Sequence, residues 1–148
     1  MKENDLQIIG RIERMDIPEW FLFGLEAKID TGAFSSSIHC HRIEAFVKNT
    51  QEWVRFSLLD PEHEAYNNKI FELPISDVRE VKSSNGLTES RYFVRARIQL
   101  NHRIIDTELS LTDRSEMKFP VLLGRKFLMN RFLVDVAKVH TSKKSMQN

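Results

Sequence analysis

The tetrapeptide Asp30-Thr31-Gly32-Ala33 is the most distinctive candidate for chemistry in this chain. It directly follows a segment in which apolar and polar residues alternate as they do in a β-strand. A carboxylate at a strand end, followed by a glycine turn, is held by the backbone and can face a cleft, where it could exchange protons with a substrate. An aspartate that only caps its own turn has the same local sequence. This motif alone therefore leaves a catalytic and a structural role open.

The segment Leu122-Leu123-Gly124-Arg125 is the second candidate. Two aliphatic residues, a glycine and an arginine stand there at the expected start of a helix. They form a compact packing unit, which by itself predicts only a junction between a strand and a helix.

The pair His63-Glu64 is the only His-Glu step in the sequence and the first place to look for metal ligands. Zinc peptidases commonly carry two histidines one helical turn apart, with a glutamate between them. The position of the second histidine holds Asn67. The zinc motif is therefore incomplete.

The tripeptide His39-Cys40-His41 is the other metal candidate. In a strand the two histidines would share one face while the cysteine points to the other, so the three side chains cannot easily meet one ion. Partly buried strand residues are the simpler interpretation. The sequence also has no Gly-x-x-x-x-Gly-Lys loop for a nucleotide phosphate. We expect no metal and no cofactor.

Arginines are numerous for a chain of formal net charge +1. Arg95 and Arg97 alternate with apolar residues and therefore share one face of an expected strand. A solvated charged face is the ordinary interpretation, and a cationic cleft for an acidic peptide is the functional alternative. Both stay open here, with Arg95 as the candidate for substrate contact. The arginines considered are Arg79, Arg91, Arg95, Arg97, Arg114 and Arg125.

Short strands separated by turns account for most of the chain. The Asn85-Gly86 step supplies the positive φ angles of a tight hairpin turn, and residues 125–131 have the length and composition of a short helix. This pattern predicts a small, barrel-like all-β domain with one late helix. The strands are expected at residues 8–12, 25–30, 37–43, 53–59, 71–75, 78–82, 92–100, 104–111, 119–123 and 133–136.

The composition is that of an ordinary globular protein. Hydrophobic residues make up 41% and charged residues 29%, which excludes a disordered or collagen-like chain. With 22 Lys and Arg against 21 Asp and Glu, no broad positive surface for nucleic acid or an anionic membrane is expected. The single Cys40 cannot form an intramolecular disulfide, which favours a reducing, cytoplasmic compartment.

The chain is expected to form one domain over residues 1–148. Its ordered core should span about residues 8–140, and residues 141–148 should form a frayed polar tail. No apolar run approaches the roughly 18 residues of a membrane helix, and the N-terminal segment does not have the pattern of a secretory signal.

Taken in order along the chain, three features resemble the retropepsin-like aspartic proteases: the Asp30 motif, a hairpin with a glycine tip, and the Gly124 motif before a short helix and a last strand. Residues 9–39 are similar to a bacterial and archaeal branch labelled "putative ATP-dependent zinc proteases". Members of that branch are often found beside ATP-grasp ligases of the kind that adds glutamate to ribosomal proteins. The resemblance covers roughly residues 8–137. It implies a closed all-β acid-protease barrel with a flap hairpin and one short C-terminal helix.

By this resemblance Asp30 would be the catalytic residue, Thr31 would brace it through its hydroxyl, and Gly32 would let two such loops approach closely. Asp-Thr-Gly occurs once in the sequence, so a second copy of the chain would supply the other aspartate. The two carboxylates would share a proton and a water, one acting as base while the other polarises the scissile carbonyl. The active unit would be a homodimer.

The resemblance also assigns supporting roles. Leu123, Gly124 and Arg125 would support the site from behind. Phe34 stands where viral retropepsins carry a second acidic residue that pairs with this arginine, so the partner of Arg125 has to be found elsewhere. Substrate contacts would come from Ala33, Ser83, Ser84, Asn85 and Gly86, in addition to Arg95.

The sequence therefore predicts an aspartic endopeptidase that hydrolyses peptide bonds. An acidic or glutamate-tailed protein is the expected substrate, with a functional link to an ATP-grasp ligase and no nucleic-acid or membrane partner. Two alternatives stay open: a non-catalytic peptide-binding module on the same barrel, and a zinc-dependent peptidase, as the family label suggests.

Overall fold

The computed structural model describes residues 5–58, 69–82, 86–113 and 118–141. Strands dominate this part of the chain, which confirms the predicted all-β class. The strands are β1 (Gln7–Ile9), β2 (Ile12–Ile17), β3 (Leu22–Ile29), β4 (Ser36–His39), β5 (His41–Lys48), β6 (Gln51–Leu58), β7 (Lys69–Pro74), β8 (Asp77–Lys82), β9 (Thr88–Leu100), β10 (Arg103–Thr112), β11 (Val121–Leu123) and β12 (Phe132–Val134). The helices are the 3-10 turn η1 (Pro18–Trp20) and α1 (Arg125–Leu128).

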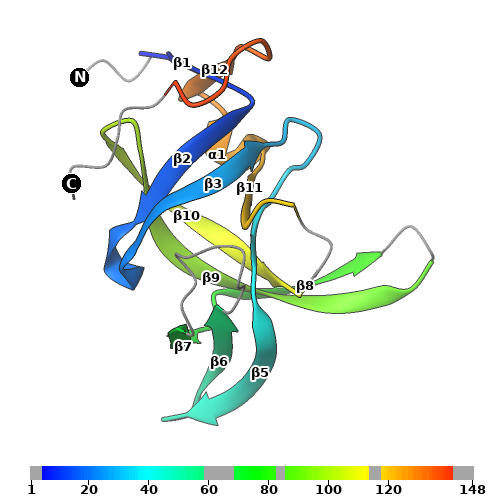
Figure 1. The fold of residues 1–148 in the computed structure, drawn as a ribbon. Coiled ribbons are helices and arrows are strands. Elements are labelled where there is room, and N and C mark those ends of the chain that lie inside the picture. Colours follow the sequence, from blue (N-terminus) through cyan, green and yellow to red (C-terminus); the bar gives the residue numbers. More distant parts are fainter. Residues whose placement is uncertain (1–4, 59–68, 83–85, 114–117, 142–148) are drawn as a thin grey trace.

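Six strands close into a barrel in the order β10-β4-β11-β3-β2-β9, and the pairing of β9 with β10 completes the ring (Figure 1). β4 runs parallel to β10, and β11 runs parallel to β3. The alternation in β3 turns Leu25, Ala27 and Ile29 into the barrel, where each is at most 6% exposed. The closed barrel expected from the sequence is therefore confirmed.

A second sheet, β5-β6-β7, extends from the barrel below it in Figure 1. An aromatic cluster joins it to η1. The ring centroids of Trp20 and Phe71 lie 5.2 Å apart, and those of Phe56 and Phe71 lie 5.6 Å apart. Packing of these three aromatic rings, two of them buried, gives this junction a large apolar contact area, so the small sheet is anchored on the barrel.

A third sheet consists of β1 and β12, which pair in parallel. The sequence predicted one strand over residues 8–12, and the structure corrects it to two strands that break at Gly10. A Cβ atom at Gly10 would lie 2.3 Å from the carbonyl oxygen of Lys138. The C-terminal segment crosses β1 and β2 so closely here that only glycine fits.

Several other element boundaries differ from the expectation, and two of these differences have a clear local cause. The predicted strand at 37–43 divides at Cys40, whose N–H donates to the carbonyl of Thr112, after which β5 leaves the barrel to pair with β6. The predicted helix at 125–131 ends at Leu128, because Met129 has an extended ψ of 129°. Asn130 then adopts a left-handed φ of 66°.

The hairpin of β8 and β9 projects from the barrel (Figure 1). Lys82 pairs with Thr88, and Gly86 has a φ of 86° in the connection between them. Ser83, Ser84 and Asn85 of the expected tip lie outside the described residues.

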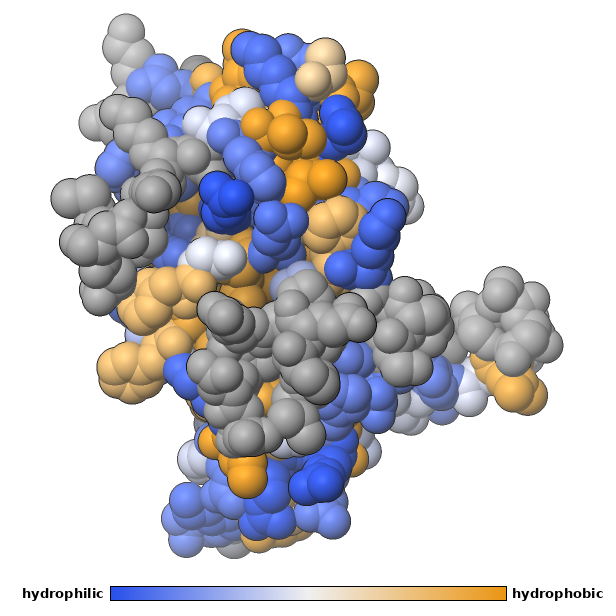
Figure 2. Space-filling view, viewed as in Figure 1, coloured by the Kyte–Doolittle hydropathy of each residue, from blue (hydrophilic) through white to orange (hydrophobic). Residues whose placement is uncertain are grey.

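The surface mixes polar and apolar groups. Figure 2 shows hydrophobic side chains gathered near the top of one face, in the region of α1 and β12, while the far end of the three-stranded sheet is hydrophilic. Exposed apolar residues on β1, after α1 and on β12 are Ile8, Met129 and Leu133. Within the described ranges, no helix is long and apolar enough to cross a membrane.

Candidate active site

Asp30 follows the last residue of β3 and begins the turn into β4 (Figure 1). Its main-chain N–H donates to the carbonyl of Leu123 at 2.8 Å, which fixes the start of the turn beside β11. Its carboxylate Oδ1 accepts the N–H of Gly32 at 3.0 Å. Asp30 therefore does cap its own turn, and that contact fixes the carboxylate while leaving the side chain only half-buried.

Gly124 packs directly against this turn. A Cβ atom there would lie 2.5 Å from the carbonyl oxygen of Ser35 and 2.8 Å from those of Ala33 and Phe34. All three obstacles are main-chain atoms, which cannot swing away as a flexible side chain could. The N–H of Gly124 donates to Ser36 Oγ at 3.0 Å. The turn and the start of α1 are thus packed too closely for any residue other than glycine at this position.

Main-chain hydrogen bonds join the same two segments. The N–H of Arg125 donates to the carbonyl of Ala33 at 2.8 Å, and the N–H of Lys126 donates to that of Phe34 at 3.0 Å. These N–H groups belong to the first turn of α1, where main-chain N–H groups have no carbonyl partner inside the helix. The loop after Asp30 therefore caps α1.

Arg125 has a partner that sequence reasoning did not find. Its Nη1 donates to the carbonyl oxygen of Thr31 at 3.0 Å. Its guanidinium also lies 5.8 Å from the ring centroid of Phe34, within the range of a cation–π contact. Arg125 thus holds the Asp30 turn through the main chain of Thr31. It also contacts Phe34, the residue that stands in place of the expected acid.

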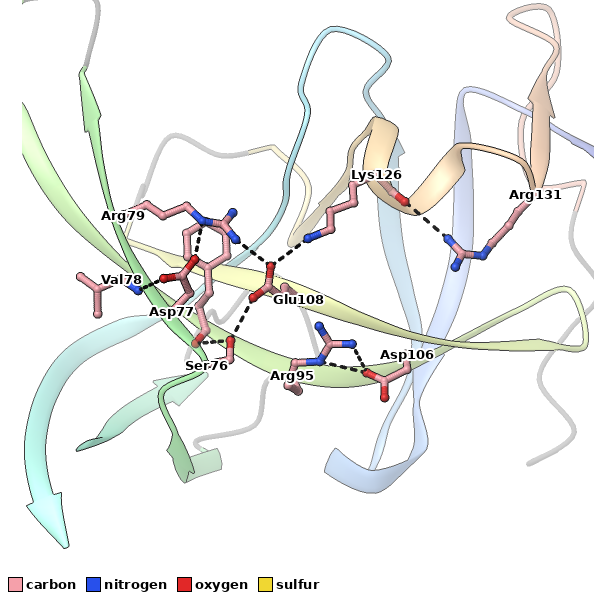
Figure 3. Close-up of polar contacts among 10 residues, drawn as sticks. Ser76, Asp77, Val78, Arg79, Arg95, Asp106, Glu108, Lys126 and Arg131 are labelled. Carbon is pink, nitrogen blue, oxygen red and sulfur yellow. Dashed lines mark hydrogen bonds and ion pairs between the residues drawn. The ribbon is translucent and has the colours of Figure 1, made fainter. Parts of the chain in front are cut away.

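A second polar cluster lies beside α1 and centres on Glu108 of β10 (Figure 3). Its carboxylate accepts Arg79 Nη2 at 2.9 Å, Lys126 Nζ at 3.2 Å and Ser76 Oγ at 3.3 Å. The Glu108 side chain is only 12% exposed. Burial by itself raises the pKa of Glu108, but the hydrogen bonds and charges of Lys126 and Arg79 outweigh it and hold that pKa below its usual value.

This cluster ties the base of the β8–β9 hairpin to α1. Arg79 of β8 also binds Asp77 at 2.7 Å and lies 4.2 Å over the ring of Phe93. Lys126 is the residue next to Arg125, which holds the Asp30 turn. The first two residues of α1 therefore connect the Asp30 turn on one side with the hairpin base on the other.

The arginines on the outer strand face are largely paired with acids. Arg95 Nη2 lies 2.7 Å from Asp106 Oδ1, Arg91 Nε lies 3.1 Å from Glu89 Oε1, and Arg79 has two acidic partners. Arg95 is therefore committed to an intramolecular ion pair. Its role in substrate contact stays a prediction.

His39 ends β4 and His41 begins β5, and their rings pack edge to face with centroids 4.6 Å apart. His41 Nδ1 lies 3.4 Å from Asp113 Oδ1, and Cys40 is fully buried. Burial raises the pKa of the Cys40 thiol to about 12, so it is a poor thiolate ligand. Over the described ranges, no group of three or more His, Cys, Asp or Glu side chains is placed to hold a metal ion. His63, Glu64 and Asn67 lie outside those ranges.

Comparison with known proteins covers nearly the whole chain. A family model described as RimB-like, retropepsin-like aspartic endopeptidase RimB, matches residues 8–145. A crystal structure of a Legionella pneumophila protein of unknown function, Lpg0085, superposes with a TM-score of 0.76 and 28% identity, covering 94% of this chain and 100% of that one.

Curated relatives carry a different name. A "Probable alpha-L-glutamate ligase" of Desulfotalea psychrophila is 35% identical over 131 residues, which make up 88% of this chain and 28% of that protein. A protein of the same name from Shewanella pealeana is 37% identical over 132 residues, or 86% of this chain and 28% of that protein. The chain thus corresponds to little more than a quarter of each of these relatives.

Proposed function

Since the chain belongs to the RimB-like family of retropepsin-like aspartic endopeptidases, we propose that it hydrolyses peptide bonds with a pair of Asp30 carboxylates, one from each of two copies. The observation that carries this proposal is the construction of the Asp30 turn. A carboxylate fixed through one oxygen by Gly32 N–H lies on a turn supported by Gly124 and Arg125. Such fixed placement is what a general acid or base requires.

The reaction needs a second carboxylate, and the motif occurs once per chain. Thr31 and Gly32 are both exposed. Gly32 has no positive φ, and a Cβ atom there would meet only Asp30 Oδ1, at 3.3 Å. That contact is tight, but a small movement of the Asp30 side chain relieves it, so the fold of one chain gives only a weak reason for a glycine at this position. Close approach of the same turn from a second copy gives a stronger one, as an isologous contact would require.

The chemistry follows from two carboxylates that share one proton. The ionised carboxylate takes a proton from a water molecule as the water oxygen bonds to the carbonyl carbon. The protonated carboxylate gives its proton to the carbonyl oxygen. When the tetrahedral intermediate collapses, the C–N bond breaks and the leaving nitrogen receives a proton from one carboxyl group. One hydroxyl of the intermediate returns its proton to the other carboxylate, so the pair again shares one proton. The Thr31 hydroxyl is proposed to brace the two turns against each other.

We further propose an acidic substrate, such as a protein with a glutamate tail. The curated relatives that contain a homologous segment are named alpha-L-glutamate ligases, so a protein with added glutamate is a reasonable substrate for this chain and such a ligase a reasonable functional partner. Ala33 and the hairpin tip, which includes Gly86, are the proposed points of contact with the peptide.

The test compares wild type with Asp30→Asn on two peptides of equal length, one rich in glutamate and one rich in glutamine. We expect the wild type to cleave the glutamate peptide and the variant to lose cleavage while it keeps its folded circular dichroism spectrum. An amide can neither ionise nor share a proton. Equal cleavage by both chains would contradict the assignment of Asp30. Binding by the wild type without any cleavage would instead indicate a non-catalytic peptide-binding module.

A further inference from the structure

We propose that a hollow between the β9–β10 turn and the segment after α1 binds a carboxylate side chain of an acidic peptide. The hollow has a volume of about 430 Å³. It is separate from the Asp30 turn, which contacts the opposite end of α1 through Arg125. Its lining residues are His102, Arg103, Ile104, Ile105, Asp106 and Arg131.

Arg103 is held in this hollow by main-chain carbonyl groups. Its Nη1 donates to the carbonyl of Arg131 at 3.0 Å and to that of Asp5 at 3.2 Å. Its guanidinium lies 5.6 Å from the ring centroid of Phe132. Carbonyl partners orient a guanidinium without cancelling its net charge, and the remaining N–H groups stay available for an acceptor.

Arg131 is held in the same way from the other side. Its Nη1 donates to the carbonyl of Phe127 at 3.0 Å and reaches that of Lys126 at 3.4 Å. Figure 3 shows the side chain folded back toward the end of α1. Within the described part of the chain, neither Arg103 nor Arg131 forms an ion pair with an acidic side chain. This distinguishes them from Arg55, Arg79, Arg91 and Arg95, which all do.

Asp106, the one acid among the described residues that line the hollow, already has a partner. Asp106 Oδ1 accepts both Arg95 Nη2 at 2.7 Å and Arg95 Nε at 3.2 Å. Its charge is therefore largely neutralised by an arginine outside the hollow. The lining keeps two oriented guanidinium groups, and a guanidinium binds a carboxylate through paired hydrogen bonds.

Two further features of the lining fit this ligand. His102 has a φ of 71°, a left-handed conformation that costs a non-glycine residue energy and is often found at functional sites. It stands at the second position of the two-residue turn between β9 and β10, where glycine is the usual residue. Ile104 is 64% exposed and gives the hollow an apolar wall, on which the methylene groups of a glutamate side chain can pack.

We assign an acidic peptide as the occupant on the basis of the two arginines. Only the identification of that peptide as the substrate rests on the proposed function. The hollow would hold a glutamate of the substrate at a distance from the bond that is cleaved. Binding can be measured without cleavage, so the failure of one proposal does not imply the failure of the other.

The test uses the full chain with Asp30→Asn, which prevents cleavage, and measures binding of tetraglutamate by calorimetry at low salt. Tetraglutamine and inorganic phosphate are the comparison ligands. Arg131→Gln should weaken tetraglutamate binding about fivefold, because one charged hydrogen-bond donor is lost. Arg131 also holds main-chain groups, so Ile104→Glu is the second variant. It places a negative charge on the exposed wall, leaves those groups intact, and should weaken binding by a similar factor.

Arg42→Gln, at an exposed arginine of β5 outside the hollow, is the matched control and should leave affinity unchanged. The proposal is overturned if tetraglutamate does not bind, if tetraglutamine or phosphate binds equally well, or if Ile104→Glu leaves the affinity unchanged. Cleavage of a glutamate peptide by the wild type together with any of these results would overturn the hollow alone.

Discussion

The guanidinium of Arg125 donates a hydrogen bond of 3.0 Å to the main-chain carbonyl of Thr31. Its neighbour Lys126 binds Glu108, which in turn holds Arg79 at the hairpin base. One short helix thus connects the turn that carries Asp30 with the strand that begins the hairpin. The Asp30 turn and the base of the β8–β9 hairpin, the two parts of the proposed active site, are therefore both held by contacts with α1.

Replacing Arg125 by lysine should loosen the Asp30 turn. A lysine keeps the charge, but it lacks the planar fork that reaches the Thr31 carbonyl and stacks on Phe34. We expect the free energy of unfolding to fall by about 0.5–1.5 kcal/mol and amide hydrogen exchange to rise across residues 30–34. Arg42→Lys is the control. Unchanged exchange in this turn would contradict the role assigned to Arg125.

Gly124→Ala should destabilise the fold directly. The added Cβ would lie within 2.8 Å of three main-chain oxygens, so the turn or α1 has to shift. Forced overpacking of this kind costs about 1–3 kcal/mol, which urea unfolding would detect. A variant as stable as wild type would show that Gly124 does not fix the turn.

Gly32→Val, in contrast to Gly124→Ala, should affect activity and dimer formation but not the stability of the fold. Gly32 is exposed, and its Cβ position meets only the Asp30 carboxylate. We expect the free energy of unfolding to stay within about 1 kcal/mol of wild type, while activity is lost and sedimentation shifts toward the monomer. A stable Gly32→Val dimer with full activity would exclude close contact between two Asp30 turns.

Glu108 predicts a pH dependence with a defined sign. Its pKa is lowered in the folded chain, so its contribution to stability is present above the usual glutamate pKa and is lost as the pH falls through the folded value. Glu108→Gln should therefore lower the free energy of unfolding by about 1–2 kcal/mol at neutral pH, and the difference from wild type should shrink in acid. Urea unfolding at about pH 7 and pH 3 measures this. A difference that is independent of pH would contradict it.

Activity should survive treatment with a chelator, because the proposed reaction needs only carboxylates and water. The assay compares the rate before and after dialysis against EDTA. Loss of activity that stoichiometric zinc restores would favour the zinc-peptidase alternative instead.

Much of the barrel could be predicted from sequence because one face of each barrel strand is buried. The alternation of Leu25, Ala27 and Ile29 with Glu26 and Lys28 can be satisfied in only one register, and the structure has it. The succession of strands along the chain and the existence of a late helix followed from similar local patterns, whereas the order of the strands around the barrel did not.

The strand breaks could not be predicted, because their causes are distant in sequence. Gly10 ends β1 where the carbonyl of Lys138 approaches, and Cys40 ends β4 where its N–H meets Thr112. Neither contact leaves a trace in the local hydrophobic pattern. The early end of α1 at Leu128 is likewise invisible in the composition of residues 125–131.

The candidate site was predicted in part. The local pattern placed Asp30 at the end of a strand before a turn, whereas the packing of Gly124 against that turn was implied only by the family resemblance. The hydrogen bond from Arg125 to the Thr31 carbonyl was missed, because every residue has a main-chain carbonyl and the sequence therefore does not mark which one accepts. Glu108 was missed as well, because an acid on a strand looks solvated until the elements that cover it are known.

The most direct test of the shared carboxylate pair is a mixing experiment. Wild type is held at a fixed concentration at which sedimentation shows dimers, and folded Asp30→Asn chain is added in increasing excess. If each active unit needs one Asp30 from each copy, mixed dimers are inactive and the rate per wild-type chain falls in proportion to the wild-type fraction. A rate that stays constant while mixed dimers form would show that one chain cleaves alone, and would contradict the account.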